Sequence, residues 1–117
     1  MEYSYQQKIA IMRIFLDIIQ ADGRIDAREL FYFDLLKEQL GLSESDRSAV
    51  DKKNSLLALT QVREFSKEQK EEFAKIMSKM IIVDEDININ ELAIYEVVQD
   101  FCAIDKKFTQ NLDIECY

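Results

Sequence analysis

Hydrophobic residues recur every three or four positions along most of this chain, a spacing typical of amphipathic helices. The spacing predicts a first helix over residues 5–21, and because apolar side chains occupy most of its faces we expect it to be central and buried. Asp22-Gly23 ends this helix. The apolar residues of the helix are Ile9, Ile11, Met12, Ile14, Phe15, Leu16, Ile18 and Ile19.

Four further helical patterns follow. A second helix is predicted over residues 27–40, with Gly41 as a left-handed C-terminal cap. A third opens at Ser43-Glu44-Ser45-Asp46 and continues as one helix with a common face. A capping box at Ser66-Lys67-Glu68-Gln69 starts the fourth, and the fifth follows the second acidic loop. The residues predicted on one face are Leu30, Phe33, Leu36, Lys37 and Leu40 in the second helix, Val50, Lys53, Leu57 and Thr60 in the third, Phe73, Ile76, Met77, Met80 and Ile81 in the fourth, and Leu92, Tyr95, Val98 and Cys102 in the fifth.

Composition favours one all-α domain. A chain of 117 residues is long enough to bury a core of its own, and it has no Pro and only two Gly, so it lacks the turn residues that sheets require. No linker or shift in composition divides it. We therefore predict a single-domain helical bundle over residues 1–117, in which residues 105–117 form either one short helix around Phe108 and Leu112 or a frayed tail.

A nine-residue pattern occurs twice. Residues 22–30 and residues 84–92 both read Asp-x-x-Ile-(Asp/Asn)-x-x-Glu-Leu, and the second copy lies 62 positions after the first. The flanking helices keep the same offset, which predicts two pseudo-symmetric helix–loop–helix units packed around one shared core. The matching apolar residues are Ile14, Phe15, Ile18, Ile19, Phe33 and Leu36 in the first unit and Ile76, Met77, Met80, Ile81, Tyr95 and Val98 in the second.

Charge and residue content narrow the function. The net charge of −8 disfavours nucleic acid and anionic membrane surfaces and favours cations or basic partners. No apolar run approaches the ~20 residues that span a bilayer, no signal peptide is visible, and Cys102 and Cys116 are too few for a disulfide framework. We expect a cytoplasmic protein with a protein partner, without nucleic acid or membrane insertion, and of open oligomeric state.

The chain contains no His. This excludes the Ser-His-Asp and Cys-His nucleophile systems and the commonest nitrogen ligand of zinc. Any metal site must be built from oxygen ligands, and no organic cofactor is expected. A carboxylate-bound metal hydrolase would still need an organised substrate pocket, so we expect a protein that is not an enzyme.

The repeated acids allow two interpretations. Asp26 with Glu29, and Asn88 with Glu91, fit the first turn of a helix, where they cap free N–H groups and suit the helix dipole. Asp22 then makes a turn with Gly23. Alternatively, the carboxylates of each loop face one another and bind Ca²⁺, Mg²⁺ or Mn²⁺. The candidate metal ligands are Asp22, Asp26, Glu29, Asp84, Asp86 and Glu91.

A standard EF-hand is excluded. Its 12-residue loop ends in a bidentate Glu and needs oxygen ligands at positions 1, 3 and 5. Aligned on Glu29, positions 1 and 3 fall on Ile18 and Gln20, and the second copy places Met80 and Ile82 there. Three of these four residues have no side-chain oxygen.

Residues 21–30, followed by an apolar helix and Leu40-Gly41-Leu42-Ser43, resemble the tellurite-resistance TerB family over roughly residues 5–104. The resemblance implies an all-helical, pseudo-symmetric fold and a link to tellurite and stress resistance. It also implies divalent-metal ligands at Asp22, Asp26, Glu29, Asp84 and Glu91.

Two hypotheses for function follow. In the first, the acidic loops bind a divalent cation, fix the angle between helices and so present a helical surface to a partner. In the second, the acids only cap helices, and the protein is a metal-independent adaptor that acts through an exposed apolar face. Phe31, Tyr32 and Phe33 cannot all face one way on a helix, and Tyr32 is predicted to face a partner.

Overall fold

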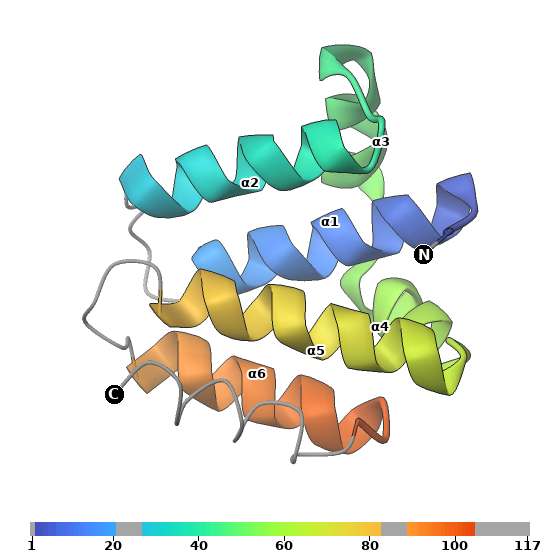
Figure 1. Ribbon diagram of the computed structural model, residues 1–117, viewed down its shortest axis with the longest axis vertical. Helices are drawn as coiled ribbons and strands as arrows, with labels where there is room; N and C mark the ends of the chain where they lie inside the picture. The colour runs from blue at the N-terminus through green and yellow to red at the C-terminus, as the bar shows by residue number, and fades with distance from the viewer. Residues whose placement is uncertain (1, 21–26, 83–88, 105–117) are drawn as a thin grey trace.

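The computed structural model describes residues 2–20, 27–82 and 89–104. Within these ranges the chain is all-α: it contains helices and no strand, as predicted. α2, α1, α5 and α6 lie in that order across the view in Figure 1. The elements are α1 (Tyr5–Ile19), α2 (Ala27–Gln39), the 3₁₀ turn η1 (Glu44–Asp46), α3 (Arg47–Lys52), α4 (Ser55–Arg63), α5 (Lys67–Ile82) and α6 (Ile89–Phe101).

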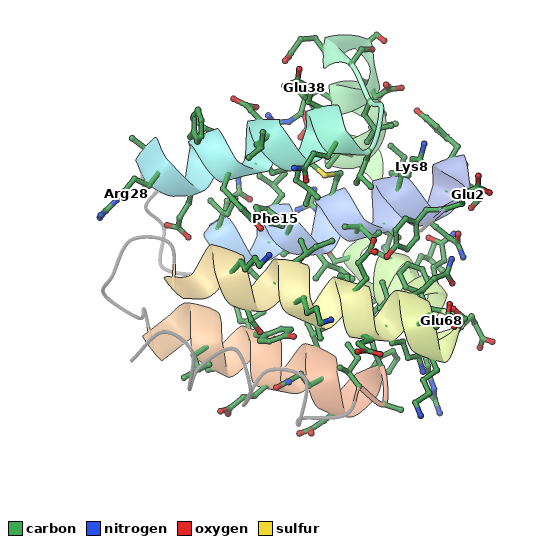
Figure 2. All side chains as sticks on the ribbon, in the orientation of Figure 1. Glu2, Lys8, Phe15, Arg28, Glu38 and Glu68 are labelled. Carbon is green, nitrogen blue, oxygen red and sulfur yellow. The ribbon has the colours of Figure 1, made fainter. Side chains whose placement is uncertain are left out.

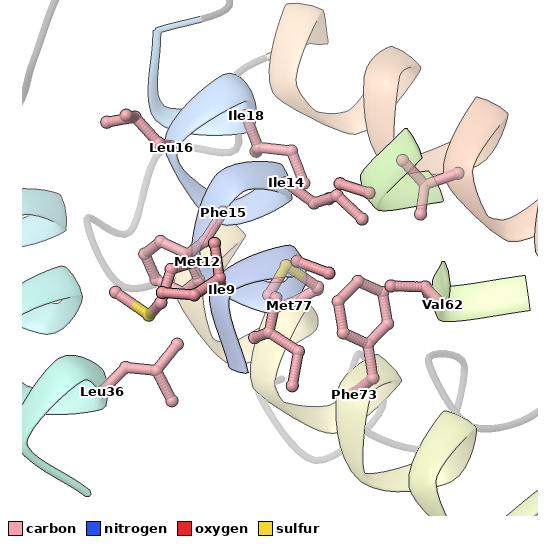
Figure 3. Close-up of a cluster of buried hydrophobic side chains, with 14 of the residues drawn as sticks. Ile9, Met12, Ile14, Phe15, Leu16, Ile18, Leu36, Val62, Phe73 and Met77 are labelled. Atoms are coloured by element: carbon pink, nitrogen blue, oxygen red, sulfur yellow. The ribbon is translucent and has the colours of Figure 1, made fainter. Parts of the chain in front are cut away.

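α1 is the central helix. It contacts α2, α3, α4 and α6, and its apolar residues are buried on most faces, as their all-round distribution predicts. Figure 3 shows Phe15 and Met12 on the side of Leu36, with Met77 and Phe73 near Val62 across the cluster. The buried residues of α1 are Ile9, Ala10, Ile11, Met12, Ile14, Phe15, Leu16, Ile18 and Ile19.

The outer surface is polar by comparison. Labelled charged side chains such as Arg28, Glu38 and Glu68 point away from the helices in Figure 2, whereas Phe15 lies between them. Lys37 was predicted on the inner face of its helix and is buried. Its ammonium group pairs with Glu44 and lies 3.7 Å from Asp34, which offsets the cost of burying the charge. No helix within the described residues has the length and apolar character to span a membrane.

The prediction of one continuous third helix is wrong. The backbone becomes extended at Lys53 (φ −67°, ψ 131°) between α3 and α4. The Asn54 side-chain oxygen accepts hydrogen bonds from the N–H groups of Leu56 at 2.8 Å and Leu57 at 3.1 Å. This cap starts a new helix in another direction, so that Val50 is buried but Leu57 is 59% exposed.

The duplication extends far beyond the nine-residue pattern. Each unit begins with a Ser-x-x-Gln capping box. The hydroxyl of Ser4 accepts from the Gln7 N–H at 3.1 Å, and the hydroxyl of Ser66 accepts from the Gln69 N–H at the same distance. In return, the Gln7 and Gln69 side chains accept from the N–H groups of Ser4 and Ser66. These residues are again 62 positions apart.

Each unit also ends in the same way. The N–H of Leu42 donates to the Lys37 carbonyl at 3.0 Å, and the N–H of Ile104 donates to the Gln99 carbonyl at 2.9 Å. Both are the long hydrogen bond of a Schellman cap, which needs a left-handed residue just before the donor. Gly41 (φ +74°) and Ala103 (φ +57°) occupy that position.

Equivalent residues of the two units touch each other. The amide nitrogen of Gln69 lies 3.4 Å from the amide oxygen of Gln7, and the rings of Tyr3 and Phe65 are 5.6 Å apart. Such self-pairing of equivalent positions occurs where a two-fold axis passes. Equivalent residues of the two units thus pair with each other where α1 and α5 begin, as a pseudo-two-fold relation between the units predicts.

Candidate functional site

The predicted cation ligands fall mostly outside the described residues. Asp22, Asp26, Asp84 and Asp86 lie there, and so does the side chain of Glu91 in α6. Within the described part of the chain, no group of three or more Asp, Glu, Cys or His side chains comes together as a metal site would require. Glu29 is the predicted ligand whose side chain is described.

Glu29 lies in the first turn of α2, as predicted from its spacing. An acid at this position is stabilised by the helix dipole. Its side chain, however, is only 5% exposed, whereas a Glu that merely serves the dipole can remain in water. A carboxylate so deeply buried requires hydrogen bonds or positive charge around it. The sequence pattern placed Glu29 correctly at the start of the helix, but it did not indicate that this side chain would be buried.

An apolar groove of about 270 Å³ lies between α1, α4 and α6 and is here called the α4–α6 groove. Ile14 and Val98 are buried and form its floor, whereas Val97 is 63% exposed and forms part of its rim. Apart from the carboxylate of Asp17, the groove presents apolar side chains. Its lining residues are Ile14, Asp17, Leu59, Ala93, Ile94, Val97 and Val98.

Helical spacing extends the groove at one end. Val97 is followed four residues later by Phe101, and Leu59 is followed by Arg63, so both helices continue the same faces. The guanidinium carbon of Arg63 lies 5.6 Å from the centre of the Phe101 ring. This cation–π contact joins α4 to α6. Upstream on α4, Leu56 continues the apolar face and is 72% exposed.

A buried thiol also joins the two walls. The Sγ of Cys102 donates to the Leu59 carbonyl at 3.4 Å, which links the end of α6 to the middle of α4. Burial raises the pKa of the Cys102 thiol to about 11. The group is therefore protonated at neutral pH, and it supports the groove rather than acting as a nucleophile.

Charged side chains of both signs lie in and near the groove. Asp17 enters the lining itself and accepts a hydrogen bond from the Nε of Arg13 at 3.1 Å. Along α6, Glu96 and Asp100 are exposed on the flank beside Val97. Arg63 is the basic residue at the other end, and its guanidinium is engaged with a ring. The lining therefore favours an apolar surface as its ligand.

The exposed aromatic residue of α2 was predicted incorrectly. Tyr32 is partly buried, and its ring stacks on Phe15 with centroids 5.7 Å apart. Burial also raises the pKa of the Tyr32 hydroxyl. Phe31 is the exposed member of the trio, at 70%. The helical pattern correctly required one of the three to be exposed, but it did not determine which, because all three are large aromatic residues.

The groove itself had only a weak signal in the sequence. The predicted inner face of the fifth helix contained Tyr95, Val98 and Cys102, which are buried, and Leu92, which is exposed. Ala93 and Val97 lie beside that face and are apolar without being needed for the core. Apolar residues out of phase with a buried stripe are the signal that could have located the groove.

Comparison with family models and with curated proteins finds no match. Among solved structures, the chain is similar to a protein of unknown function, PG1108, from Porphyromonas gingivalis W83. The TM-score is 0.74, the sequence identity is 22%, and the alignment covers 90% of this chain and 83% of the other. At this identity the similarity concerns the fold: the same helical arrangement occurs in a second, divergent sequence.

Proposed function

We propose that this protein is a non-catalytic helical module that binds a protein partner in the α4–α6 groove. The observation that carries the proposal is the groove, whose walls expose Val97 at 63% and continue to Leu56 at 72%. Isolated exposed apolar residues are common on protein surfaces, but a contiguous apolar hollow with a polar rim is typical of an interaction site. This supports the adaptor hypothesis.

The cellular setting is part of the same proposal. The resemblance of residues 5–104 to the tellurite-resistance TerB family favours a module that acts in a stress or tellurite response. A cytoplasmic location agrees with the buried, unpaired thiol of Cys102, since reduced thiols are normal there. In this role the module would supply a binding surface and no chemistry.

Site-specific photo-crosslinking in the source cells tests the groove. A photoreactive phenylalanine analogue at Val97 is expected to give a discrete crosslinked protein. The same analogue at Phe31, which is equally accessible on α2, is the control and should not give that product. Leu59→Asp, which places a charge in the lining, should abolish the Val97 product. A Val97 pattern identical to that from Phe31, or unaffected by Leu59→Asp, would contradict the proposal.

A second function is favoured by Glu29: the module responds to a divalent cation. Glu29, which is 5% exposed in the first turn of α2, follows closely in sequence on Asp22 and Asp26. Carboxylate oxygens are ligands that suit Ca²⁺, Mg²⁺ or Mn²⁺. A cation held there would fix how α2 meets α1, and the repeat extends the same expectation to Asp84, Asp86 and Glu91.

Thermal unfolding of chelator-stripped protein tests this second function. A cation at about 100 times its dissociation constant adds about 2.7 kcal/mol to the free energy of unfolding, which raises the melting temperature of a domain of this size by about 10 °C. We expect Asp22→Asn or Asp84→Asn to remove the rise, and Glu38→Gln, at an exposed site on α2, to keep it. No rise with any of the three ions would leave the acids as caps and turn residues.

A further inference from the structure

Four exposed side chains form a ridge along α2, on the side of the helix opposite to the buried Phe33. Phe31 is 70% exposed and Leu35 is 38% exposed, and the charged residues Arg28 and Glu38 follow at the two ends and point away from the helices in Figure 2. The spacing of three, four and three residues keeps all four on one stripe, as at the seam of a coiled coil. This stripe, here called the α2 ridge, belongs to a helix at the edge of the molecule (Figure 1).

We propose that a second copy of this chain docks on the α2 ridge, with the two α2 helices antiparallel. Two identical surfaces pair around a two-fold axis only if the surface complements itself. Antiparallel pairing around the middle of the α2 ridge places Phe31 against Leu35 of the second copy and Arg28 against Glu38 of the second copy. Each contact occurs twice, so four apolar side chains are flanked by an ion pair at each end.

The charges of the α2 ridge oppose the dipole of their own helix. A helix favours acids near its N-terminus and bases near its C-terminus, and the buried residues Glu29 and Lys37 follow this rule. Arg28 in the first turn and Glu38 in the last turn do the opposite. In an antiparallel pair, each of these two charges also lies beside the other end of the neighbouring helix, where the dipole favours it. The second copy thus gives both charges a favourable environment.

The other charges near the α2 ridge are compatible with this pairing. Arg28 also interacts within its own chain, but a guanidinium has five N–H donors and can serve a second acceptor. Asp34, beside the ridge, lies 3.7 Å from the ammonium group of Lys37, which also pairs with Glu44. The ridge itself carries one charge of each sign. The net charge of −8 therefore arises from residues off the ridge, and physiological salt screens charges more than about 8 Å apart.

The equivalent ridge of the second unit is less suited to self-pairing. The internal repeat places Ala93 and Val97 of α6 at the positions of Phe31 and Leu35, and Asn90 at the position of Arg28. Two α6 ridges would therefore contribute smaller apolar side chains, and no ion pair, because α6 contains no Lys or Arg. An α2 ridge against an α6 ridge would retain at most one of the two ion pairs. Charge and apolar size thus favour α2 against α2.

The size of the contact predicts a weak and reversible dimer. α2 has 13 residues and is about 20 Å long, so a contact along this helix buries less than the roughly 1,000 Å² of a lasting interface. α2 and α6 lie at opposite edges of the molecule in Figure 1, so the pairing leaves both α4–α6 grooves open. A dimer would present two grooves, and a partner with two docking segments would bind it with added avidity.

Sedimentation equilibrium of the full chain tests the proposal. At physiological ionic strength, the weight-average mass should rise from that of the monomer towards twice that value between about 10 μM and about 1 mM. Phe31→Gln should raise the dissociation constant about tenfold or more, because the largest apolar side chain of the contact is lost. Leu57→Gln, at a similarly exposed residue of α4, is the control and should leave the dissociation constant unchanged.

An exchange of charges tests the antiparallel geometry. Arg28→Glu alone and Glu38→Arg alone each place like charges at both ends of the pair, so each variant should remain monomeric at concentrations where the wild type associates. An equal mixture of the two variants restores opposite charges at both ends. The mixture should associate to within about threefold of the wild type. Amide spectra of both variants that match the wild type away from α2 show that the fold is kept.

A photoreactive phenylalanine analogue at Phe31 provides an independent measurement. It should give a covalent dimer whose crosslink maps to residues 31–38 of the second copy. A wild-type chain that remains monomeric at about 1 mM, or a mixture of charge variants that associates no better than either alone, overturns the proposal. Association that Val97→Gln abolishes and Phe31→Gln leaves intact overturns it in favour of the α6 ridge.

Two further results separate this proposal from the proposed function. A crosslink from Phe31 to a different protein, without a covalent dimer, overturns the second copy and assigns the α2 ridge to another partner. The crosslink from Val97 to a partner should persist in Phe31→Gln, because the α4–α6 groove and the α2 ridge share no residue. Loss of self-association with an intact Val97 crosslink therefore concerns the α2 ridge alone.

Discussion

At the scale of single residues, the internal repeat places a Gly and an Ala in the same backbone conformation. Gly41 has φ +74° and Ala103 has φ +57°, and each precedes the residue that closes a Schellman cap. A left-handed conformation costs a residue with a Cβ roughly 1–2 kcal/mol, while Gly adopts it freely. The second unit therefore carries strain that the first avoids.

This strain predicts that substitutions at the two positions change the stability of the protein in opposite directions. Ala103→Gly should stabilise the protein by about 1 kcal/mol, with a rise in melting temperature of about 4 °C. Gly41→Ala should destabilise it by a similar amount, and through φ alone, because the new Cβ would lie 4.0 Å from the nearest side-chain atom, Lys8 Nζ. Urea unfolding of both variants measures this. A change of the same sign in both would contradict the strain account.

The buried thiol of Cys102 leads to a prediction about pH. Burial raises the pKa of this group from 9.0 to about 11, so the neutral thiol is favoured in the folded state. The folded state holds this proton more tightly than the unfolded state does. The contribution of Cys102 to the free energy of unfolding is therefore fully present below pH 9 and is lost as the pH rises through 11. At pH 8 we expect iodoacetamide to modify Cys102 only after unfolding, as read by peptide mass spectrometry. Rapid modification of the folded protein would contradict its burial.

At the scale of elements, periodicity predicted four of the helices correctly and failed at the third predicted helix. α1, α2, α5 and α6 have long apolar stripes and recognisable ends, such as the capping box at Ser66. The stretch from Ser43 to Thr60 also shows apolar residues at helical spacing, yet it contains η1, α3 and α4. One side chain decides this difference, because Asn54 satisfies two N–H groups that a continuous helix would have bonded internally.

The role of Asn54 predicts a specific loss of stability. Asn54→Ala should cost about 1 kcal/mol of unfolding free energy, because the N–H groups of Leu56 and Leu57 lose their acceptor. Asn54→Asp should retain most of the stability, since a carboxylate oxygen can accept the same bonds. Ser48→Ala, at an exposed site in α3, is the control. Equal stability of Asn54→Ala and the control in thermal unfolding would show that packing alone determines the break.

At the scale of the whole molecule, the fold was largely predictable and the groove was not. The all-α bundle and its two units follow from residues close in sequence, because helical periodicity and the repeated pattern are local. The groove forms where Ile14, Leu59 and Val97 meet across α1, α4 and α6. These residues are far apart in the sequence, so no short-range pattern predicts that they come together. The buried state of Glu29 and the exposure of Phe31 are likewise set by how α2 rotates against α1.

The position of α1 predicts that the two units unfold together. Ile11 is fully buried in α1, which contacts helices of both units and the connecting segment. Ile11→Ala should therefore cost about 3 kcal/mol through the cavity it leaves. Hydrogen exchange should show reduced protection of similar size in α2, α4, α5 and α6 as well as in α1, because opening any of them requires α1 to lose its packing. A loss confined to residues 3–42 would instead show that the second unit is stable without the first, and that α1 is a neighbour of that unit rather than the core of both.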